Sequence, residues 1–408
     1  MAWTDFQLTV ITPLFNDDDP SVGLRVASIR GAMRFWFRAL AGTVYGSNVP
    51  ALARAEQKVF GSTERAAPVR LRLVNQPTSR HMIKAGASAP FLKSDPAKDG
   101  GPGKWVAYLL GQGLTTYDRR TRGFVTTRPY TSPGHRFTLK IAFSEDPAID
   151  SLTLASLWTA CTYGGFGART RKGFGNVRLT YKDGHLPEGP WREHSPDTPG
   201  FDHYQGLKHL PVDGPLMACA TLLRGLEPPP ENTNGLKTAP QPTLGAENTS
   251  AALSAFADDT WDAVAAETGE RYRGFRASVP HRSPNPGYKP PIKTPEYEEV
   301  VHGRGKQFPL GALGLPVNYK GGAKVTAYRE GDELRRASPL WFRFVEDEEQ
   351  GEWRLFSSAF HNPFLPPAQG VRTRLVGKNV ENKTVYITDQ DVRERTGAWM
   401  NLVRGSVS

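Results

Sequence analysis

Hydrophobic and polar positions alternate or recur at helical spacing through the first 180 residues. Phe6, Leu8 and Val10 alternate with polar residues, which is typical of a half-buried strand. Apolar residues at spacings of three and four predict a first helix capped by Ser28, and Asp150 or Ser151 is expected to cap a second. The predicted elements are, in chain order, strand 3–11, helix 28–44, strands 69–74 and 136–143, helix 152–161 and strand 176–181.

This βαββαβ order predicts an α+β, ferredoxin-like fold, the arrangement also found in RNA-recognition motifs (RRM-like). Two helices would cover one face of the sheet and leave the other free to bind. Residues 75–135, between the second and third strands, are too many for an ordinary loop. We therefore expect an inserted subdomain or hairpin there.

The second half has weaker patterns. Residues 216–225 predict a strand, residues 250–272 one or two helical segments, and residues 339–344 with 353–360 a hairpin that turns through acidic residues. Three Pro-, Asn- or Gly-rich stretches predict linkers or mobile loops; they cover residues 184–200, 227–249 and 281–297. A second α+β domain follows from these patterns. The expected organisation is an N-terminal domain over 1–183, a linker over 184–210 and a C-terminal domain over 211–408.

Positive charge is concentrated in the first half. The 408 residues have a net charge of +10, yet residues 1–180 carry 24 Lys or Arg against 12 Asp or Glu, and residues 181–408 carry 27 against 29. Arginine suits bidentate phosphate contacts and base stacking, so nucleic acid is the first partner to consider. An acidic protein surface or an anionic membrane is the alternative.

Several classes of protein are disfavoured by composition. The two cysteines form no CxxC pair, and the nine histidines form no HxxxH pair, so we expect no metal site and no cofactor. No run approaches the 18 apolar residues of a membrane span, and the N-terminus lacks a signal-peptide pattern. A cytoplasmic protein without a membrane partner is expected. No nucleophile–base set is recognisable, so no catalytic residue is predicted.

Arginines recur along the first predicted helix. Like charges at a spacing of four residues repel, so an exposed stripe of this kind favours an anion such as phosphate. The alternative is that the arginines pair with Glu56 and Glu64 within the domain. The residues concerned are Arg25, Arg30, Arg34 and Arg38.

A glycine-rich loop, GGFGARTRKGFGNV, joins the second helix to the last strand. Glycines let backbone amides approach a phosphodiester, and the cations of the loop neutralise it, which suits RNA. The loop lacks the GK[ST] of a nucleotide-binding Walker loop. The alternative is a turn that needs glycine for tight packing. Its glycines are Gly164, Gly165, Gly167, Gly173 and Gly175, and its cations are Arg169, Arg171 and Lys172.

Three adjacent carboxylates, Asp17 to Asp19, follow the first predicted strand. Carboxylate oxygens suit Mg²⁺, so these residues could support metal-dependent cleavage of RNA. Adjacent side chains rarely converge on one ion, and a solvated acidic turn is the favoured interpretation.

The chain resembles the RAMP superfamily and, within it, the first-subunit family of the Cmr complex, the type III-B CRISPR effector. The resemblance spans most of the chain and rests on five segments, LRVASIRGAMRFWFRAL, EQKVFGST, GGFGARTRKGFG, GALGLPV and RRASPLWFRF. It implies two tandem ferredoxin-like RAMP domains with long loop insertions and a non-catalytic RNA-binding role near the guide 3′ end. The implied RNA contacts are Arg25, Arg30, Arg34, Arg38, Arg169, Arg171 and Lys172.

Three hypotheses follow. The first is a subunit that binds guide (CRISPR) RNA and target RNA beside a neighbouring RAMP subunit and other Cmr subunits. The second is a metal-dependent endoribonuclease that uses Asp17 to Asp19. Relatives tend to have small, glycine-containing residues at this position, so the three carboxylates depart from the family pattern, and this departure favours the metal hypothesis. The third is a structural subunit whose basic half docks on an acidic partner.

Overall fold

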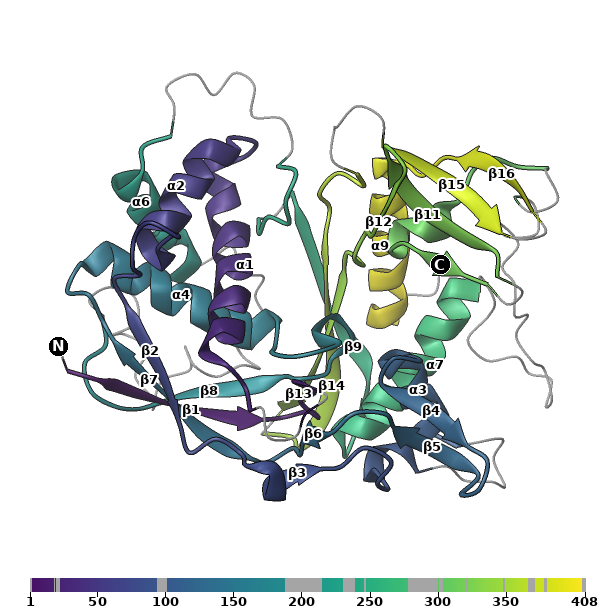
Figure 1. Ribbon diagram of the computed structural model, residues 1–408, viewed down its shortest axis with the longest axis horizontal. Coiled ribbons are helices and arrows are strands. Elements are labelled where there is room, and N and C mark those ends of the chain that lie inside the picture. Colours follow the sequence, from purple (N-terminus) through teal and green to yellow (C-terminus); the bar gives the residue numbers. More distant parts are fainter. Residues whose placement is uncertain are drawn as a thin grey trace.

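The fold mixes helices with antiparallel sheets (Figure 1). The computed structural model describes residues 2–17, 19, 23–93, 101–187, 215–229, 239–245, 247–277, 300, 304–319, 322–347, 349–365, 371–377 and 380–405. Most of the predicted linker and the Pro-rich stretch 281–297 lie outside these residues. Within the described parts of the chain, no helix is long and apolar enough to cross a membrane.

The first sheet has the predicted ferredoxin-like connectivity. Strands β1 (Thr4–Val10), β2 (Arg70–Val74), β7 (Arg136–Ala142) and β8 (Val177–Asp183) lie in the order β2-β7-β1-β8, and each neighbouring pair is antiparallel. The alternation in β1 is confirmed, because Phe6, Leu8 and Val10 are buried whereas the residues between them are half-buried. The order strand, helix, strand, strand, helix, strand is therefore confirmed for the first half.

Helices α1 (Val26–Tyr45), α2 (Val49–Phe60) and α4 (Pro147–Tyr163) gather on one face of this sheet (Figure 1). The two predicted helix starts were wrong by a few residues. Helix α1 begins after Arg25, with no side-chain cap, and Ser28 lies inside its first turn.

Helix α4 begins earlier than predicted. Asp146 is its cap, and its carboxylate accepts hydrogen bonds from the amides of Ala148 and Ile149. A proline at the first helical position permits this earlier start, since that position needs no N–H. Asp150 instead accepts from the amide and hydroxyl of Ser144.

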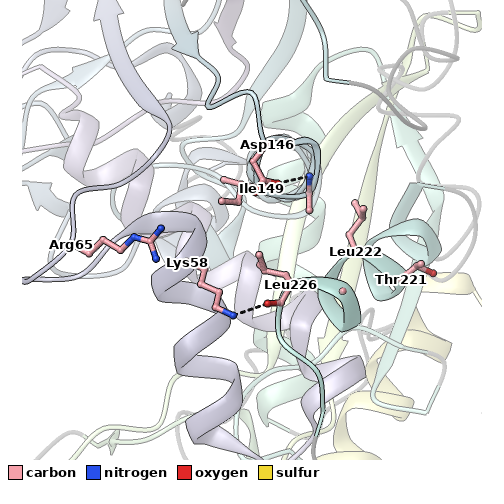
Figure 2. A pocket seen from close by; sticks show the side chains of 9 residues that line it. Lys58, Arg65, Asp146, Ile149, Thr221, Leu222 and Leu226 are labelled. Carbon is pink, nitrogen blue, oxygen red and sulfur yellow. Dashed lines mark hydrogen bonds between the residues drawn. The ribbon is translucent and has the colours of Figure 1, made fainter.

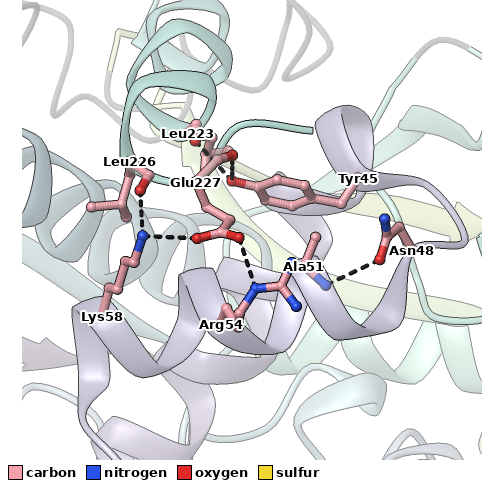
Figure 3. Close-up of polar contacts among 8 residues, drawn as sticks. All are labelled: Tyr45, Asn48, Ala51, Arg54, Lys58, Leu223, Leu226 and Glu227. Atoms are coloured by element: carbon pink, nitrogen blue, oxygen red, sulfur yellow. Dashed lines mark hydrogen bonds and ion pairs between the residues drawn. The ribbon is translucent and has the colours of Figure 1, made fainter. Parts of the chain in front are cut away.

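Residues 215–226 form helix α6 (Pro215–Leu226), so the strand predicted there is wrong. A short run of Ala, Leu and Met is compatible with either structure by periodicity, and these are good helix formers. The helix packs on α1, α2 and α4. Figure 3 shows the contacts that hold its C-terminal end. Tyr45 donates to the carbonyl of Leu223 over 2.7 Å, and Lys58 and Arg54 pair with Glu227 over 2.7 and 2.8 Å.

The insertion between β2 and β7 contains strands, a helix and a hairpin. Strands β3 (Met82–Ile83) and β6 (Tyr130–Thr131) pair with each other. Between them lie helix α3 (Gly103–Leu110) and the hairpin of β4 (Thr115–Asp118) and β5 (Gly123–Thr126). Helix α3 packs against α7 (Trp261–Ala277) of the second half, so the insertion contacts both halves of the chain.

A second, three-stranded sheet carries the order β13-β14-β9. The predicted hairpin is confirmed as β13 (Leu340–Asp347) and β14 (Glu352–Phe360). The helical prediction for residues 250–272 is wrong at its start, where β9 (Thr249–Asp258) pairs with β14, and correct from α7 (Trp261–Ala277). Small Ser and Ala residues carry a weak hydrophobic signal, so the alternation in β9 is easily missed.

The second half repeats part of the first connectivity. Helix α7 separates the first two strands, as α1 does, and helix α9 (Asp389–Arg404) follows the third. A further sheet lies between these elements in the sequence and has the path β10-β11-β15-β16, with β12 paired to β11. Its strands are β10 (Val317–Asn318), β11 (Lys324–Arg329), β12 (Asp332–Leu334), β15 (Arg372–Gly377) and β16 (Val380–Val385).

Candidate nucleic-acid interface

The glycine-rich loop between α4 and β8 is held by hydrogen bonds to β13 of the second half. Fully buried Asn176 donates to the carbonyl of Gly164 over 3.0 Å and accepts from the amide of Phe344 over 3.4 Å. Arg343, buried on β13, donates to the carbonyl of Val177 over 2.9 Å. Burial lowers the pKa of Arg343 to about 10. Both ends of the loop therefore depend on residues that are distant in sequence.

The glycines of this loop approach protein atoms closely. Gly175 has φ of +68°, and a Cβ there would clash with the carbonyl oxygen of Phe166. Gly173 has φ of +84°, and a Cβ there would clash with the ring of Phe344. A Cβ would also meet atoms too closely at Gly164, Gly165 and Gly167. The packing role considered from the sequence is thus present in the structure.

Two of the loop's cations point inward, onto aromatic rings. The guanidinium carbon of Arg171 lies 4.8 Å from the ring centroid of Trp341. The ammonium of Lys172 lies 4.0 Å from the ring centroid of Tyr272 and 4.5 Å from that of Phe342. Burial lowers the pKa of Arg171 to about 10, with Arg336 adding to the shift. Burial also lowers the pKa of Lys172, and three neighbouring arginines lower it further.

Arg169 is the exposed cation of the loop. It adopts the left-handed conformation, with φ of 63°. Its guanidinium lies beside the backbone of Gly111, which leads into the β4–β5 hairpin. The amide of the preceding residue, Ala168, donates to the carbonyl of Phe15 over 2.8 Å. The loop therefore adjoins both the hairpin and the segment that follows β1.

The arginines of α1 separate into two environments. Arg34 bonds to the carbonyls of Phe60 and Gly61 over 2.9 and 2.7 Å, and Glu56 pairs with both Arg34 and Arg38. The sequence-based alternative is thus confirmed for Glu56, although neither arginine pairs with Glu64.

Arg30, one helical turn before Arg34, makes no hydrogen bond or ion pair to the residues that the structure describes. Burial and the charge of Arg34 lower its pKa. Among the described residues, therefore, no group takes up the hydrogen-bond donors of Arg30.

The acidic residues after β1 contact a cation. The carboxylate of Asp17 accepts from the guanidinium of Arg25 over 2.9 Å, and the Arg25 side chain is 62% exposed. Asp19 donates its amide to Asp17 over 3.3 Å, while Asp18 lies outside the described residues. In the described ranges, no three His, Cys, Asp or Glu residues are grouped to hold a metal ion.

A basic hairpin tip was missed from the sequence. Arg119, Arg120 and Arg122 connect β4 to β5 and are exposed, and Tyr117 beside them is 52% exposed. The signal that could have found it is the run YDRRTRGF, in which three arginines follow an aromatic residue. Arginine and exposed aromatic rings together are the residue types that bind single-stranded nucleic acid.

An open groove of about 460 Å³ lies among α2, α4 and α6 (Figure 2). Lys58 and Arg65 enter it from one side and Leu222 from the other. Lys58 is already bonded to Glu227 and to the carbonyl of Leu226. Asp146 is occupied as the cap of α4. These residues provide no nucleophile–base pair.

Known proteins match the chain over most of its length. A family model described as the RAMP superfamily matches residues 7–178. CRISPR system Cmr subunit Cmr1-2 of Pyrococcus furiosus is 33% identical over 182 residues, 43% of the chain and 93% of that relative. Cmr subunit Cmr1-1 of the same organism is 28% identical over 345 residues, 83% of the chain and 82% of that relative.

The fold also resembles a solved structure. The crystal structure of apo Cmr1 from Pyrococcus furiosus superposes with a TM-score of 0.52 and 22% identity, over 97% of each chain. The sequence matches and the connectivity of the first sheet agree with one another. The chain therefore belongs to the RAMP superfamily and, within it, to the RAMP proteins of the Cmr (type III-B) CRISPR systems.

Proposed function

We propose that this chain is the first RAMP subunit of a Cmr effector complex and binds RNA without cutting it. Its ligands are the guide RNA, near the 3′ end, and the paired target RNA in antiviral defence. Two Cmr subunits that match over 93% and 82% of their lengths support this assignment. The partial repeat β9-α7-β13-β14-α9 supports two tandem ferredoxin-like domains, divided near residues 184–210.

The observation that carries the proposal is a set of exposed or half-buried cations on adjoining segments, here named the basic path. The glycine-rich loop contacts the segment after β1, where Asp17 bonds to Arg25, and it contacts Gly111 ahead of the hairpin. The three segments are therefore neighbours in space. The basic path consists of Arg25, Arg30, Arg119, Arg120, Arg122 and Arg169.

The chemistry of the basic path favours recognition of phosphates and shape over base sequence. Arginine guanidiniums bind phosphate oxygens with a planar fork of donors. Tyr117 offers one exposed ring on which a base can stack, and stacking tolerates any base. Such a surface suits a subunit that must hold guides of many sequences.

The proposed partners are a neighbouring RAMP subunit at the end of the filament and further Cmr subunits. Five of the seven arginines and lysines implied by family resemblance contact groups within this chain. Arg34, Arg38, Arg171 and Lys172 are held by carbonyls, a carboxylate or aromatic rings, whereas Arg25 pairs with Asp17 and keeps 62% of its side chain exposed. The RNA contacts of the first domain are accordingly assigned to the basic path.

The test is a titration of the full chain into labelled single-stranded RNA of about 40 nucleotides, at about 50 and 200 mM salt. Neutralisation of about four to six phosphates gives a slope of log K against log salt of about −3 to −4. A slope near zero would overturn the proposal. Intact RNA with Mg²⁺ or Mn²⁺ is expected throughout, whereas cleavage that an Asp17→Asn substitution abolishes would establish the endoribonuclease alternative.

A further inference from the structure

The face of the first sheet that points away from α1, α2 and α4 carries mostly polar side chains, and we name it the open face (Figure 1). Successive residues of a strand point to opposite faces, and the apolar set that includes Phe6 and Leu8 packs with the helices. The register of the four strands therefore defines the exposed or half-buried residues of the open face. They are Arg70, Arg72 and Val74 of β2, Arg136, Thr138 and Lys140 of β7, Asp5, Gln7 and Thr9 of β1, and Arg178, Thr180 and Asp183 of β8.

The strand residues at the centre of the open face are not aromatic. Gln7 of β1 lies between Thr138 of β7 and Thr180 of β8, its two cross-strand neighbours. Sheets that bind single-stranded RNA present aromatic side chains at such positions, because an unpaired base stacks on a ring. Amide and hydroxyl groups make directional hydrogen bonds instead. The centre of the open face is therefore unsuited to base stacking.

Charges of both signs lie on the open face. Lys140 pairs with Asp5 over 2.7 Å, and Arg178 pairs with Glu346 of β13 over 3.4 Å. The phosphates of RNA carry only negative charge, so these carboxylates would repel an RNA backbone laid across the face. The surface of another protein can match both signs. The mixed pattern therefore favours a protein partner.

Positive charge predominates among the remaining side chains of the open face. Arg72 and Arg136 are exposed and make no hydrogen bond or ion pair to the residues that the structure describes. Asp183 is an exposed carboxylate, and it lies on the opposite edge strand of the sheet, β8. A partner surface with more carboxylates than cations complements this distribution, and such complementarity speeds encounter and fixes orientation.

An exposed tryptophan stands at one corner of the open face. Trp3 lies two residues before Asp5, on the same face, and is 38% exposed. The guanidinium carbon of Arg70 lies 5.9 Å from its ring centroid. Tryptophan and arginine are among the residue types that dominate the energy of protein–protein binding. Their mutual contact restricts both side chains beforehand, so a partner that covers them loses less entropy.

We propose that the open face is a docking surface for an acidic surface of a neighbouring Cmr subunit, with Trp3 and Arg70 as its main contacts. This inference rests on the proposed function, because it takes the partner from the same complex, and it names the surface that this partner covers. The RNA contacts stay with the basic path, which shares no residue with the open face. Assembly and RNA binding then use different arginines of the first half.

The first experiment measures association of the ribonuclease-treated full chain with each of the other Cmr subunits, purified separately, by biolayer interferometry at about 50 and 200 mM salt. We expect one subunit to bind, and to bind more weakly at the higher salt. The variant that combines Arg72→Glu with Arg136→Glu should weaken this association at least about tenfold, because it sets like charges against the partner.

A matched control carries the same two charge reversals on another sheet. Arg329→Glu with Arg372→Glu changes exposed arginines of the neighbouring strands β11 and β15, and it should alter the association by no more than about twofold. A second test variant, Trp3→Ala, introduces no charge and should weaken the association by about thirtyfold. Thermal melting of each variant establishes that it is folded.

The outcomes separate this inference from the proposed function. Association that neither test variant weakens, or that the control weakens equally, would overturn the docking surface, as would the absence of binding by every Cmr subunit. Titration with labelled single-stranded RNA should be the same for the wild type and both test variants. Lower RNA affinity of the double arginine variant with unchanged subunit association would assign the open face to RNA and overturn its assignment to a protein. A wild type that binds no RNA would overturn the proposed function, whatever its association with other subunits.

Discussion

Arg343 on β13 donates a hydrogen bond to the carbonyl of Val177, the first residue of β8, over 2.9 Å. The bond crosses from the second half of the chain into the central sheet of the first. It places one positively charged group against the end of the glycine-rich loop, where the same guanidinium also reaches the carbonyl of Gly164 over 3.4 Å. A single buried side chain therefore holds both ends of that loop.

Arg343→Lys should destabilise the protein, because an ammonium keeps the charge but cannot span both carbonyls. Removal of one charge-assisted hydrogen bond costs about 1.5–3 kcal/mol of unfolding free energy. Urea unfolding of the full chain measures it. The exposed Arg372→Lys is the control and should lie within about 0.5 kcal/mol of the wild type. Equal stability of the two variants would contradict the structural role of Arg343.

Two glycine-to-alanine substitutions should have opposite signs. At Gly175, alanine must adopt φ of +68°, which costs about 1–2 kcal/mol, and its Cβ meets the Phe166 carbonyl as well. At Gly31, in the middle of α1, a Cβ meets nothing within 4 Å. Alanine there should stabilise by about 0.5–1 kcal/mol. The Tm values of the two variants are compared by thermal melting. A lower Tm for Gly31→Ala would show that other atoms of the protein lie against Gly31 on the exposed side of α1.

Arg30 and Arg34 should separate binding from stability. Arg34→Gln breaks bonds to two carbonyls and to Glu56, so unfolding free energy should fall by about 1–2 kcal/mol. Arg30→Gln removes no bond within the described residues and relieves repulsion by Arg34, so stability should change by less than about 0.5 kcal/mol. RNA affinity should fall for Arg30→Gln. If Arg30→Gln binds RNA as the wild type does, Arg30 is not part of the basic path.

The hairpin tip should contribute to RNA affinity without affecting stability. Replacement of Arg119, Arg120 and Arg122 by Gln should reduce the salt slope by about 2, at about 0.7 per phosphate contact. Tm should be unchanged, since all three side chains are exposed. A reduced affinity with an unchanged salt slope would point to an indirect effect on Tyr117.

Lys172 should make stability rise with pH. Its pKa in the folded protein is lowered by burial and by neighbouring cations below the ordinary 10.5, so above the folded pKa the unfolded chain binds more protons. Between that lowered pKa and the ordinary 10.5, unfolding free energy should therefore increase with pH, by at most about 1.4 kcal/mol per pH unit.

The pH window ends where other groups contribute. Buried Cys161 and Cys219 have raised pKa values, near 12, and act in the opposite direction above about pH 8.5. The difference between wild type and Lys172→Met, measured by urea unfolding at each pH, isolates the lysine. A difference that does not change with pH would mean that Lys172 has the same protonation in both states.

Local patterns predicted the parts of the fold that depend on strong alternation or helical spacing. The inward Phe6 and Leu8 of β1 and the hairpin that contains Phe342 are of this kind. Helix α6 and strand β9 were assigned wrongly because short runs of small or mixed apolar residues satisfy more than one period.

The candidate site was predictable in composition but not in orientation. The glycine-rich loop was identified correctly as cationic. However, Arg171 and Lys172 point inward, onto the rings of Trp341 and Tyr272, and the loop sequence does not indicate this. No local pattern links residues so far apart in sequence. The basic tip at Arg119 was overlooked because the insertion around it had no assigned structure.

The contact between α3 and α7 has a consequence for dissecting the molecule. The ring of Tyr108 in α3 packs at a tilt against the ring of Tyr272 in α7, with centroids 6.4 Å apart, although α3 belongs by sequence to the first half. An element of the first half is thus part of the packing of the second half. A cut between the two halves would expose apolar surface on each fragment. Fragments expressed separately should aggregate, whereas fragments produced together should reassemble, which makes this chain suitable for split-protein complementation.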